Sequence, residues 1–184
     1  MALNVANARI FGSDLDKVLI GPLGTTMPTN LSAPNVALLD VGWLHTDGIP
    51  FTPADSVEKF RGHQGGGVVR TTVTESDLSF GFQCLETTAL TLGLQHNVAT
   101  SVTTTGVTTI TASPSRKILA RAFVLDLYDH DNTAIQYRYV IPRGEIGERG
   151  EFSYVNNDIT GFTFTVQVIG SFNIITNDPA AVTV

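Results

Sequence analysis

The chain is poor in charge for its size. Charged residues make up 15% of its 184 residues, against about a quarter in an average soluble protein. So little charge indicates that part of the surface is covered by other subunits, and we therefore expect assembly. The 11 lysines and arginines are outnumbered by 17 aspartates and glutamates. This balance argues against a protein that grips nucleic-acid phosphates tightly.

Cysteine and long apolar runs are also scarce. The single cysteine, Cys84, excludes an internal disulfide. It lies within an alternating apolar run, so we interpret it as a small buried hydrophobic residue. No run of about 18 apolar residues occurs, and residues 1–14 lack the pattern of a secretory signal. The sequence therefore predicts neither export nor a membrane anchor.

Arrangements typical of metal sites are missing. His45, His63 and His96 have no zinc-like spacing and no second cysteine beside them. The run Asp126, Asp129 and Asp131 lacks the central glycine and the terminal glutamate of a calcium loop. We interpret this run as a solvated turn and expect no metal site.

Catalytic motifs are missing too. Glu145, Glu148 and Glu151 are interpreted as an exposed loop between strands rather than as a paired acid and base. The glycine-rich run 62–67 has no following Lys-Ser or Lys-Thr and so does not match a phosphate-binding loop. No serine lies in a Gly-x-Ser-x-Gly elbow. We expect no catalytic residues and no cofactor, and therefore a protein that is not an enzyme.

Residues that favour strands are abundant, and they predict a mostly β protein. The chain has 24 threonines together with many valines and phenylalanines, which suit a pleated, half-buried backbone. Residues 78–84, 135–141 and 162–168 alternate apolar and polar side chains, which is typical of strands with one dry face. Residues 117–128 are apolar in both registers and predict a central strand that forms a hairpin with 135–141.

The remaining segments predict shorter elements within a single domain of residues 1–184. Short strands are expected at 18–21, 38–44 and 68–75, with a turn at Asp47-Gly48. One helix is expected over Glu86–Gln95, with Glu86 in its first turn. The only tryptophan, Trp43, is expected in the core. We expect mobile segments at the N-terminal arm (about 1–16), two loops (about 21–34 and 98–115) and the C-terminal tail (about 173–184).

The first half of the sequence resembles a known family. Residues 41–48, Val-Gly-Trp-Leu-His-Thr-Asp-Gly, look like a turn of the major tail tube proteins of long-tailed bacteriophages, and Asp47-Gly48-Ile49 matches the acidic-Gly-Ile step of that turn. Residues 67–75, followed by 78–82 and Leu85-Glu86, are similar to the paired strands that run into the helix of that family. Residues 18–25 with 27–29 resemble its opening strand and proline-containing loop. The resemblance covers roughly residues 15–95.

This resemblance implies a tail-tube-type β-sandwich or half-barrel with one flanking α-helix. Six subunits would close into a ring around a continuous β-barrel, and rings would stack into the tail tube through which DNA is ejected. Its partners would be further copies of itself and the tape measure, tail terminator and baseplate or tail-tip proteins. Viral DNA would pass without specific binding, and the protein would belong to the virion tail after assembly in the host bacterial cytoplasm.

Two alternatives stay open at this point. A tail terminator or head-tail joining ring would share the fold but would stop at one ring. A carbohydrate-binding or adhesin-like β-sandwich would need a cluster of exposed aromatic side chains.

A ring requires residues that face its lumen and residues that join its subunits. The polar faces of the predicted strands supply the candidate lumen-facing residues Arg70, Thr72, Thr74, Ser79, Gln83, Gln136, Arg138, Thr163, Thr165 and Gln167. Candidate contacts between rings or subunits are Leu3, Val5, Ile10, Phe11, Leu23, Met27, Val102, Val107 and Ile110. A negative wall would repel DNA phosphates, so acids or neighbouring subunits are expected to offset Arg70 and Arg138.

Overall fold

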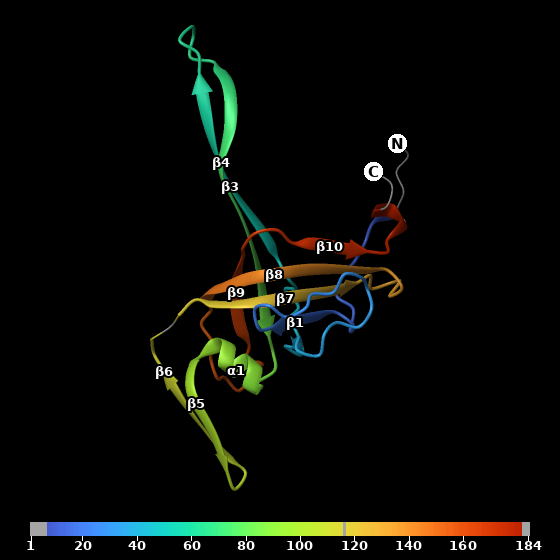
Figure 1. Cartoon of the computed structure of the whole chain (residues 1–184), viewed down its shortest axis with the longest axis vertical. Coiled ribbons are helices and arrows are strands. Elements are labelled where there is room, and N and C mark those ends of the chain that lie inside the picture. Colours follow the sequence, from blue (N-terminus) through green and yellow to red (C-terminus); the bar gives the residue numbers. More distant parts are fainter. Residues whose placement is uncertain (1–6, 116, 182–184) are drawn as a thin grey trace.

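A computed structural model of the chain describes residues 7–115 and 117–181, and these residues form a mostly β structure (Figure 1). The strands are β1 (Lys17–Gly21), β2 (Leu39–Asp40), β3 (Phe51–Arg61), β4 (Val68–Cys84), β5 (Asn97–Thr104), β6 (Val107–Ser113), β7 (Leu119–Tyr128), β8 (Gln136–Arg149), β9 (Phe162–Val168) and β10 (Asn173–Thr176). One α-helix, α1 (Ala89–Gln95), follows β4, and a short 3-10 helix spans Pro179–Ala181. The prediction of a mostly β protein is confirmed.

Most of the strands belong to one antiparallel sheet. Its order is β2-β1-β7-β8-β9-β4-β3, and β10 pairs with the first half of β8. The sheet curls, because Phe80 of β4 reaches Phe123 of β7 with 5.4 Å between the ring centroids although β8 and β9 lie between these strands. The described residues do not form a closed barrel within the subunit. The predicted pairing of β7 with β8 is confirmed.

The concave side of the curled sheet holds the main core. Phe80, Phe82, Phe123 and Phe164 are buried and contact one another through their rings. Strand alternation sends every second side chain of β9 and of the last part of β4, from Phe80 to Cys84, into this core. Each such aromatic side chain stabilises the fold by about 1.5–3 kcal/mol. The helix α1 adds the buried Leu94 to the same cluster.

The opposite face is covered where β1 and β7 lie. Leu19 and Val124 pack there against Leu38, with the partly buried Met27 beside them. Residues from Ala122 to Asp126 are buried on both sides of the strand. The prediction of a central strand with two covered faces is confirmed, and the cover is the segment between β1 and β2.

Two hairpins extend from opposite sides of this body (Figure 1). The longer one consists of β3 and β4, and every residue from Thr52 to Asp77 except Gly62 is exposed. The separately predicted strands 68–75 and 78–84 are one continuous strand of 17 residues. The segment expected to be mobile at 98–115 forms the hairpin of β5 and β6, and its chain reverses at Thr105 and Gly106, which both have positive φ.

Several local predictions are wrong. The helix begins at Ala89, because Thr88 caps it in a reciprocal arrangement with Thr91, and no acidic residue lies in its first turn. Glu145 and Glu148 lie within β8 rather than in a loop. Trp43 is 69% exposed instead of being part of the core.

The exposure of Trp43 follows from the turn that precedes it. Gly42 has a φ of +84°, and a Cβ atom there would overlap the carboxylate of Glu86. That carboxylate accepts a hydrogen bond from the backbone N–H of Trp43 at 3.0 Å. Only glycine fits this conformation and this close approach together.

Gly42→Ala should therefore destabilise the subunit more than Gly24→Ala does. Gly24 has a similar φ of +82° but no atom near the added Cβ position, so it measures the backbone cost alone, about 1–2 kcal/mol. Gly42→Ala also displaces the Glu86 carboxylate and breaks its exposed hydrogen bond to the N–H of Trp43, which should cost about 0.5–1.5 kcal/mol more. Urea unfolding followed by circular dichroism gives both values, and equal losses would refute the role of Glu86.

Candidate assembly surface

Strands β4 and β9 present a row of polar side chains on the side opposite to the phenylalanine core. Thr163 and Gln83 are cross-strand partners, as are Gln167 and Ser79. Thr165 lies opposite Gly81 and is exposed. These residues are neighbours because the strands pair in register while Phe162, Phe164 and Val166 turn inward. The structure therefore brings together five of the candidate lumen-facing residues.

Two glutamates of β8 extend this row. Glu145 is paired with Gln167, and Glu148 is paired with Thr165. The alternation of β8 does not reveal them, because one irregularity between Ile141 and Gly144 shifts Glu145 and a bulge at Gly147 shifts Glu148. Together with the threonines and glutamines they form what we call the polar face: Ser79, Gln83, Glu145, Glu148, Thr163, Thr165 and Gln167.

Three further candidates lie on the projecting part of β4. Ser56 pairs with Glu75 and Val57 with Val73, which leaves Thr74 as the extra residue of a bulge. The bulge reverses the alternation, so that Arg70 and Thr72 share the side of Ser79. All three candidates are exposed on the hairpin rather than on the body of the sheet.

The expectation that Arg138 and Gln136 face a lumen is wrong. Arg138 is 2% exposed and Gln136 is 7% exposed. The Arg138 guanidinium donates from Nε and Nη2 to the carboxylate of Asp126, at 2.5 and 2.7 Å. Its Nη1 donates to the backbone carbonyls of Asn30 and Ser32 at 2.8 and 2.6 Å. The segment between β1 and β2 therefore covers this end of the face, and Arg138 holds it down.

A second ion pair joins the two ends of the described chain. Arg9 donates from Nε and Nη2 to the carboxylate of Asp178, both at 2.7 Å. The hydroxyl of Tyr137 donates to the same carboxylate at 2.7 Å, and the Asp178 side chain is 1% exposed. These bonds, that of Arg9 first, hold the pKa of Asp178 well below its usual range.

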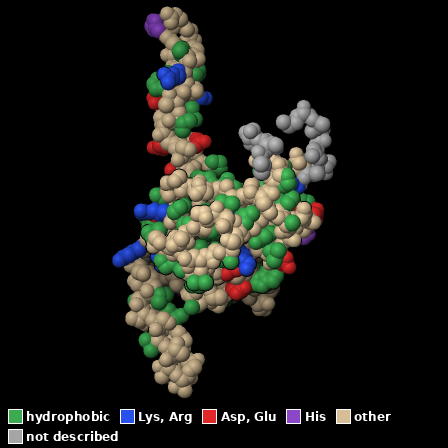
Figure 2. All heavy atoms as spheres, turned by 45° about the vertical axis from the view of Figure 1, so that its right-hand side comes forward, with side chains coloured by type: hydrophobic (Ala, Val, Ile, Leu, Met, Phe, Trp, Pro, Cys, Tyr) green, Lys and Arg blue, Asp and Glu red, His purple; other side chains and the backbone are tan. Residues whose placement is uncertain are grey.

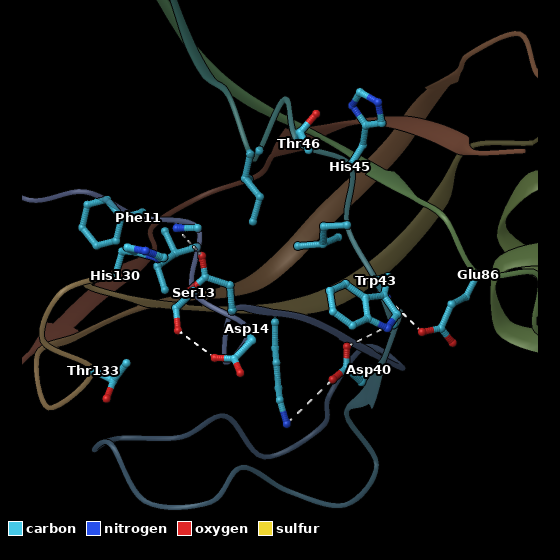
Figure 3. Close-up of a pocket in the computed structure, with 18 residues that line it drawn as sticks. Phe11, Ser13, Asp14, Asp40, Trp43, His45, Thr46, Glu86, His130 and Thr133 are labelled. Carbon is cyan, nitrogen blue, oxygen red and sulfur yellow. Dashed lines mark hydrogen bonds and ion pairs between the residues drawn. The ribbon is translucent and has the colours of Figure 1, made fainter. Parts of the chain in front are cut away.

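An open groove of about 1020 Å³ lies where residues 11–17 face residues 40–49. Figure 3 shows Phe11 and His130 on one side, Trp43 and Glu86 on the other, and Asp14 and Asp40 between them. Leu44, Ile49 and Leu127 add apolar side chains to its lining. We call this the Trp43 groove. No local pattern in the sequence reveals this groove, because it combines segments that are far apart in the chain.

The candidate contact residues are largely exposed. In the described part of the chain the exposed ones are Ile10, Phe11, Leu23, Val102, Val107 and Ile110, with exposures of 40–68%. Met27 differs, because it packs against Leu19, Leu38 and Val124 within the subunit. Leu3 and Val5 lie outside the described residues.

Within residues 7–115 and 117–181, no group of three or more His, Cys, Asp or Glu side chains is arranged to hold a metal ion. Cys84 is buried as predicted, and desolvation raises the pKa of its thiol to about 12. A thiol with so high a pKa is a poor nucleophile. No helix in this part of the chain is long and apolar enough to cross a membrane.

Comparisons with known proteins identify a family for the chain. A family model described as phage tail tube protein matches residues 1–180. No curated protein matches the chain significantly. Among solved structures, a chain from the cryo-EM structure of the anti-feeding prophage baseplate, determined with 6-fold symmetry, is 11% identical. Its TM-score is 0.47, and the match covers 95% of this chain and 97% of that one.

Removing one partner of the buried Arg138–Asp126 pair should destabilise the subunit strongly. Arg138→Met leaves the Asp126 carboxylate buried without its cation, and we expect the free energy of unfolding to fall by about 3–5 kcal/mol. The double variant Arg138→Met/Asp126→Leu removes both charges and should recover part of that loss. Chemical denaturation measures both, and a double variant less stable than the single one would contradict this account.

Asp178→Asn should make the stability of the subunit depend less on pH in the acid range. The pKa of Asp178 is lower in the folded state than its ordinary value of 3.8. Its stabilising effect is therefore complete above about pH 4 and is lost as the pH falls toward the folded value. Thermal melts between about pH 2 and pH 7 should show that the melting temperature falls more steeply at acid pH for the natural chain than for the variant. Asp131→Asn, which alters an exposed side chain, is the control and should keep the steep profile.

Proposed function

The chain belongs to the phage tail tube protein family, and we propose that its copies close into hexameric rings that stack into the conduit for DNA ejection. Membership of the family makes the protein a structural component of the phage tail. What we propose beyond family membership is the ring, the stacking of rings and the passage of DNA. Its assembly would take place in the cytoplasm of the bacterial host.

The polar face is the observation that carries the proposal. Seven polar side chains lie together on β4, β8 and β9, directly behind the phenylalanine core. A tube wall built of sheets needs one dry face for each subunit and one wet face for the channel. In the described part of the chain the outer edge of β3 pairs with no other strand. Pairing of such an edge between neighbouring copies would remove the template for uncontrolled association.

The charges of the polar face suit a passage for DNA. Glu145 and Glu148 are acidic. Arg143 contacts Glu145 at 2.6 Å and offsets its charge, but this contact does not offset the charge of Glu148. An acidic wall repels phosphates and prevents the DNA from sticking. Because the repulsion is screened beyond about 8–10 Å at cellular salt, only charges on the wall itself act.

The partners proposed from the family are proteins of the same tail. Tape measure protein would occupy the lumen during assembly, while tail terminator and baseplate or tail-tip proteins would contact the two ends of the tube. A role as a tail terminator or joining ring is the nearest alternative, because such a protein forms one ring. A carbohydrate-binding role rests on the exposure of Trp43 alone, and a glycan array is its direct test.

Electron microscopy of the purified chain tests the proposal directly. We expect rings that stack into tubes of uniform diameter at high protein concentration. Single rings that never stack would favour the terminator alternative. A chain that stays monomeric in sedimentation velocity at high concentration would contradict the proposal.

A positive charge on the polar face should impair DNA passage without preventing assembly. Glu148→Lys/Thr165→Lys alters two paired and exposed residues, and we expect normal tubes but a loss of infectivity of at least about tenfold because lysines bind phosphates. The control Glu151→Lys/Asp158→Lys alters exposed residues outside the polar face. Complementation of a phage that lacks the gene measures both, and equal titres would exclude the polar face as the lumen.

A further inference from the structure

The Trp43 groove exposes aromatic side chains that nothing in the described part of the chain covers. Trp43 is 69% exposed and Phe11 is 42% exposed, and both line the groove. Tryptophan is the residue type most enriched at the energetic centres of protein interfaces. An exposed tryptophan in a groove of this size therefore indicates a docking surface.

The charge of the groove restricts what can dock there. Four carboxylates line it, and one lysine is near them; the five residues are Asp14, Asp16, Asp40, Glu86 and Lys17. Lys17 lies 3.9 Å from Asp40 and offsets part of the charge. A partner segment should thus be basic and should carry apolar side chains that reach Trp43.

The chain itself has such a segment at the outer end of β3 and β4, residues 58–71, which we call the hairpin tip. Three bases against one acid give the tip a formal charge of +2, and the remaining eight bases against sixteen acids give the rest of the chain −8. Figure 2 shows the lysines and arginines toward the outer end of the hairpin and the acids where it leaves the body. Phe60 and Val69 in the tip are 48% and 76% exposed.

The tip and the groove lie in different parts of the molecule. In Figure 1 the hairpin extends along the long axis away from the body, while β1, whose Lys17 lines the groove, lies within the body. A subunit therefore cannot fill its own groove with its own tip. A contact between two different patches of identical subunits repeats head to tail and builds a stack.

We propose that the hairpin tip of one copy docks in the Trp43 groove of a second copy. Arg70 and Phe60 are cross-strand partners on one face of the hairpin, so Arg70 meets the carboxylates of the groove while Phe60 covers Trp43. Lys59 lies on the other face and adds to the positive charge of the tip. A guanidinium or ammonium group over the indole adds a cation–π contact. The inference rests on the proposed function, because it names the contact through which one ring holds the next.

A charge-swap experiment tests this contact. The tip variant is Lys59→Glu/Arg70→Glu, which leaves Arg61 bonded to the carbonyl of Gly66. The groove variant is Asp14→Lys/Asp40→Lys. It removes the bonds that Asp14 accepts from Ser13 and Asp40 from the N–H of Gly42, and it keeps those of Asp16 and Glu86. In either variant tip and groove carry the same sign of charge, and we expect the critical concentration for tubes to rise by at least about a hundredfold.

Mixing the two variants restores both pairings. The acidic tip of one then meets the basic groove of the other, and the basic tip of the second meets the acidic groove of the first. We expect the equimolar mixture to form tubes near the concentration of the natural chain. The control Glu151→Lys/Asp158→Lys changes the net charge as the groove variant does, but at exposed sites outside the groove, and it should assemble normally.

The single tryptophan provides a second reading of the same experiment. Because Trp43 is the only one in the chain, its fluorescence reports the groove alone. Its emission should shift to shorter wavelength when the natural chain or the variant mixture assembles, and should not shift in either variant alone. Tubes without this shift, or variants that stack as well as the natural chain, would overturn the docking while leaving the proposed function intact.

The two hypotheses can fail separately. If the natural chain forms no rings or tubes, the proposed function fails, and sedimentation of the variant mixture still decides the docking. A complex in the mixture that neither variant forms alone supports the docking, and its absence overturns it.

Discussion

Burial of phenylalanine on one side of a curled sheet is the interaction on which the subunit depends. Phe80, Phe82 and Phe164 come from the neighbouring strands β4 and β9. Phe123 comes from β7, two strands further along the sheet, and it meets them only because the sheet bends. The period of a strand is two residues, so each inward phenylalanine places its neighbour on the outer side. Thr163, Thr165 and Ser79 are in this way held on the wet face by the core behind them. The dry face and the polar face have one cause.

The parts of the fold that could be predicted are those in which this alternation is visible. Strands β4, β7 and β9 carry long apolar runs at strand spacing, so their existence and faces follow from the sequence alone. β3 has no such signal, because both of its faces are exposed over almost its whole length. Bulges at Thr74 and Gly147 shift the polar positions by one residue, which no regular period can anticipate.

The candidate site was predictable in its outline but not in its buried charges. Arg138 belongs to a polar register, and alternation alone places it in solvent. Its partner could be found from the turn, because pairing Tyr128 with Gln136 sets Asp126 opposite Arg138. The carbonyls of Asn30 and Ser32 that complete its burial come from a loop about a hundred residues away, and no local pattern reveals them. Trp43 lies outside the core for a different reason: the positive φ of Gly42 turns the chain outward just before it.

The exposed hairpins and the polar face suit a subunit that forms part of a larger wall. The central claim is that the polar face borders the channel of that wall. A helical cryo-EM reconstruction of assembled tubes measures it most directly through the radial positions of Thr165 and of α1. The account predicts that Thr165 and Glu148 border the channel, with α1 at a larger radius. A map in which the polar face contacts a neighbouring subunit or the outer surface would contradict it.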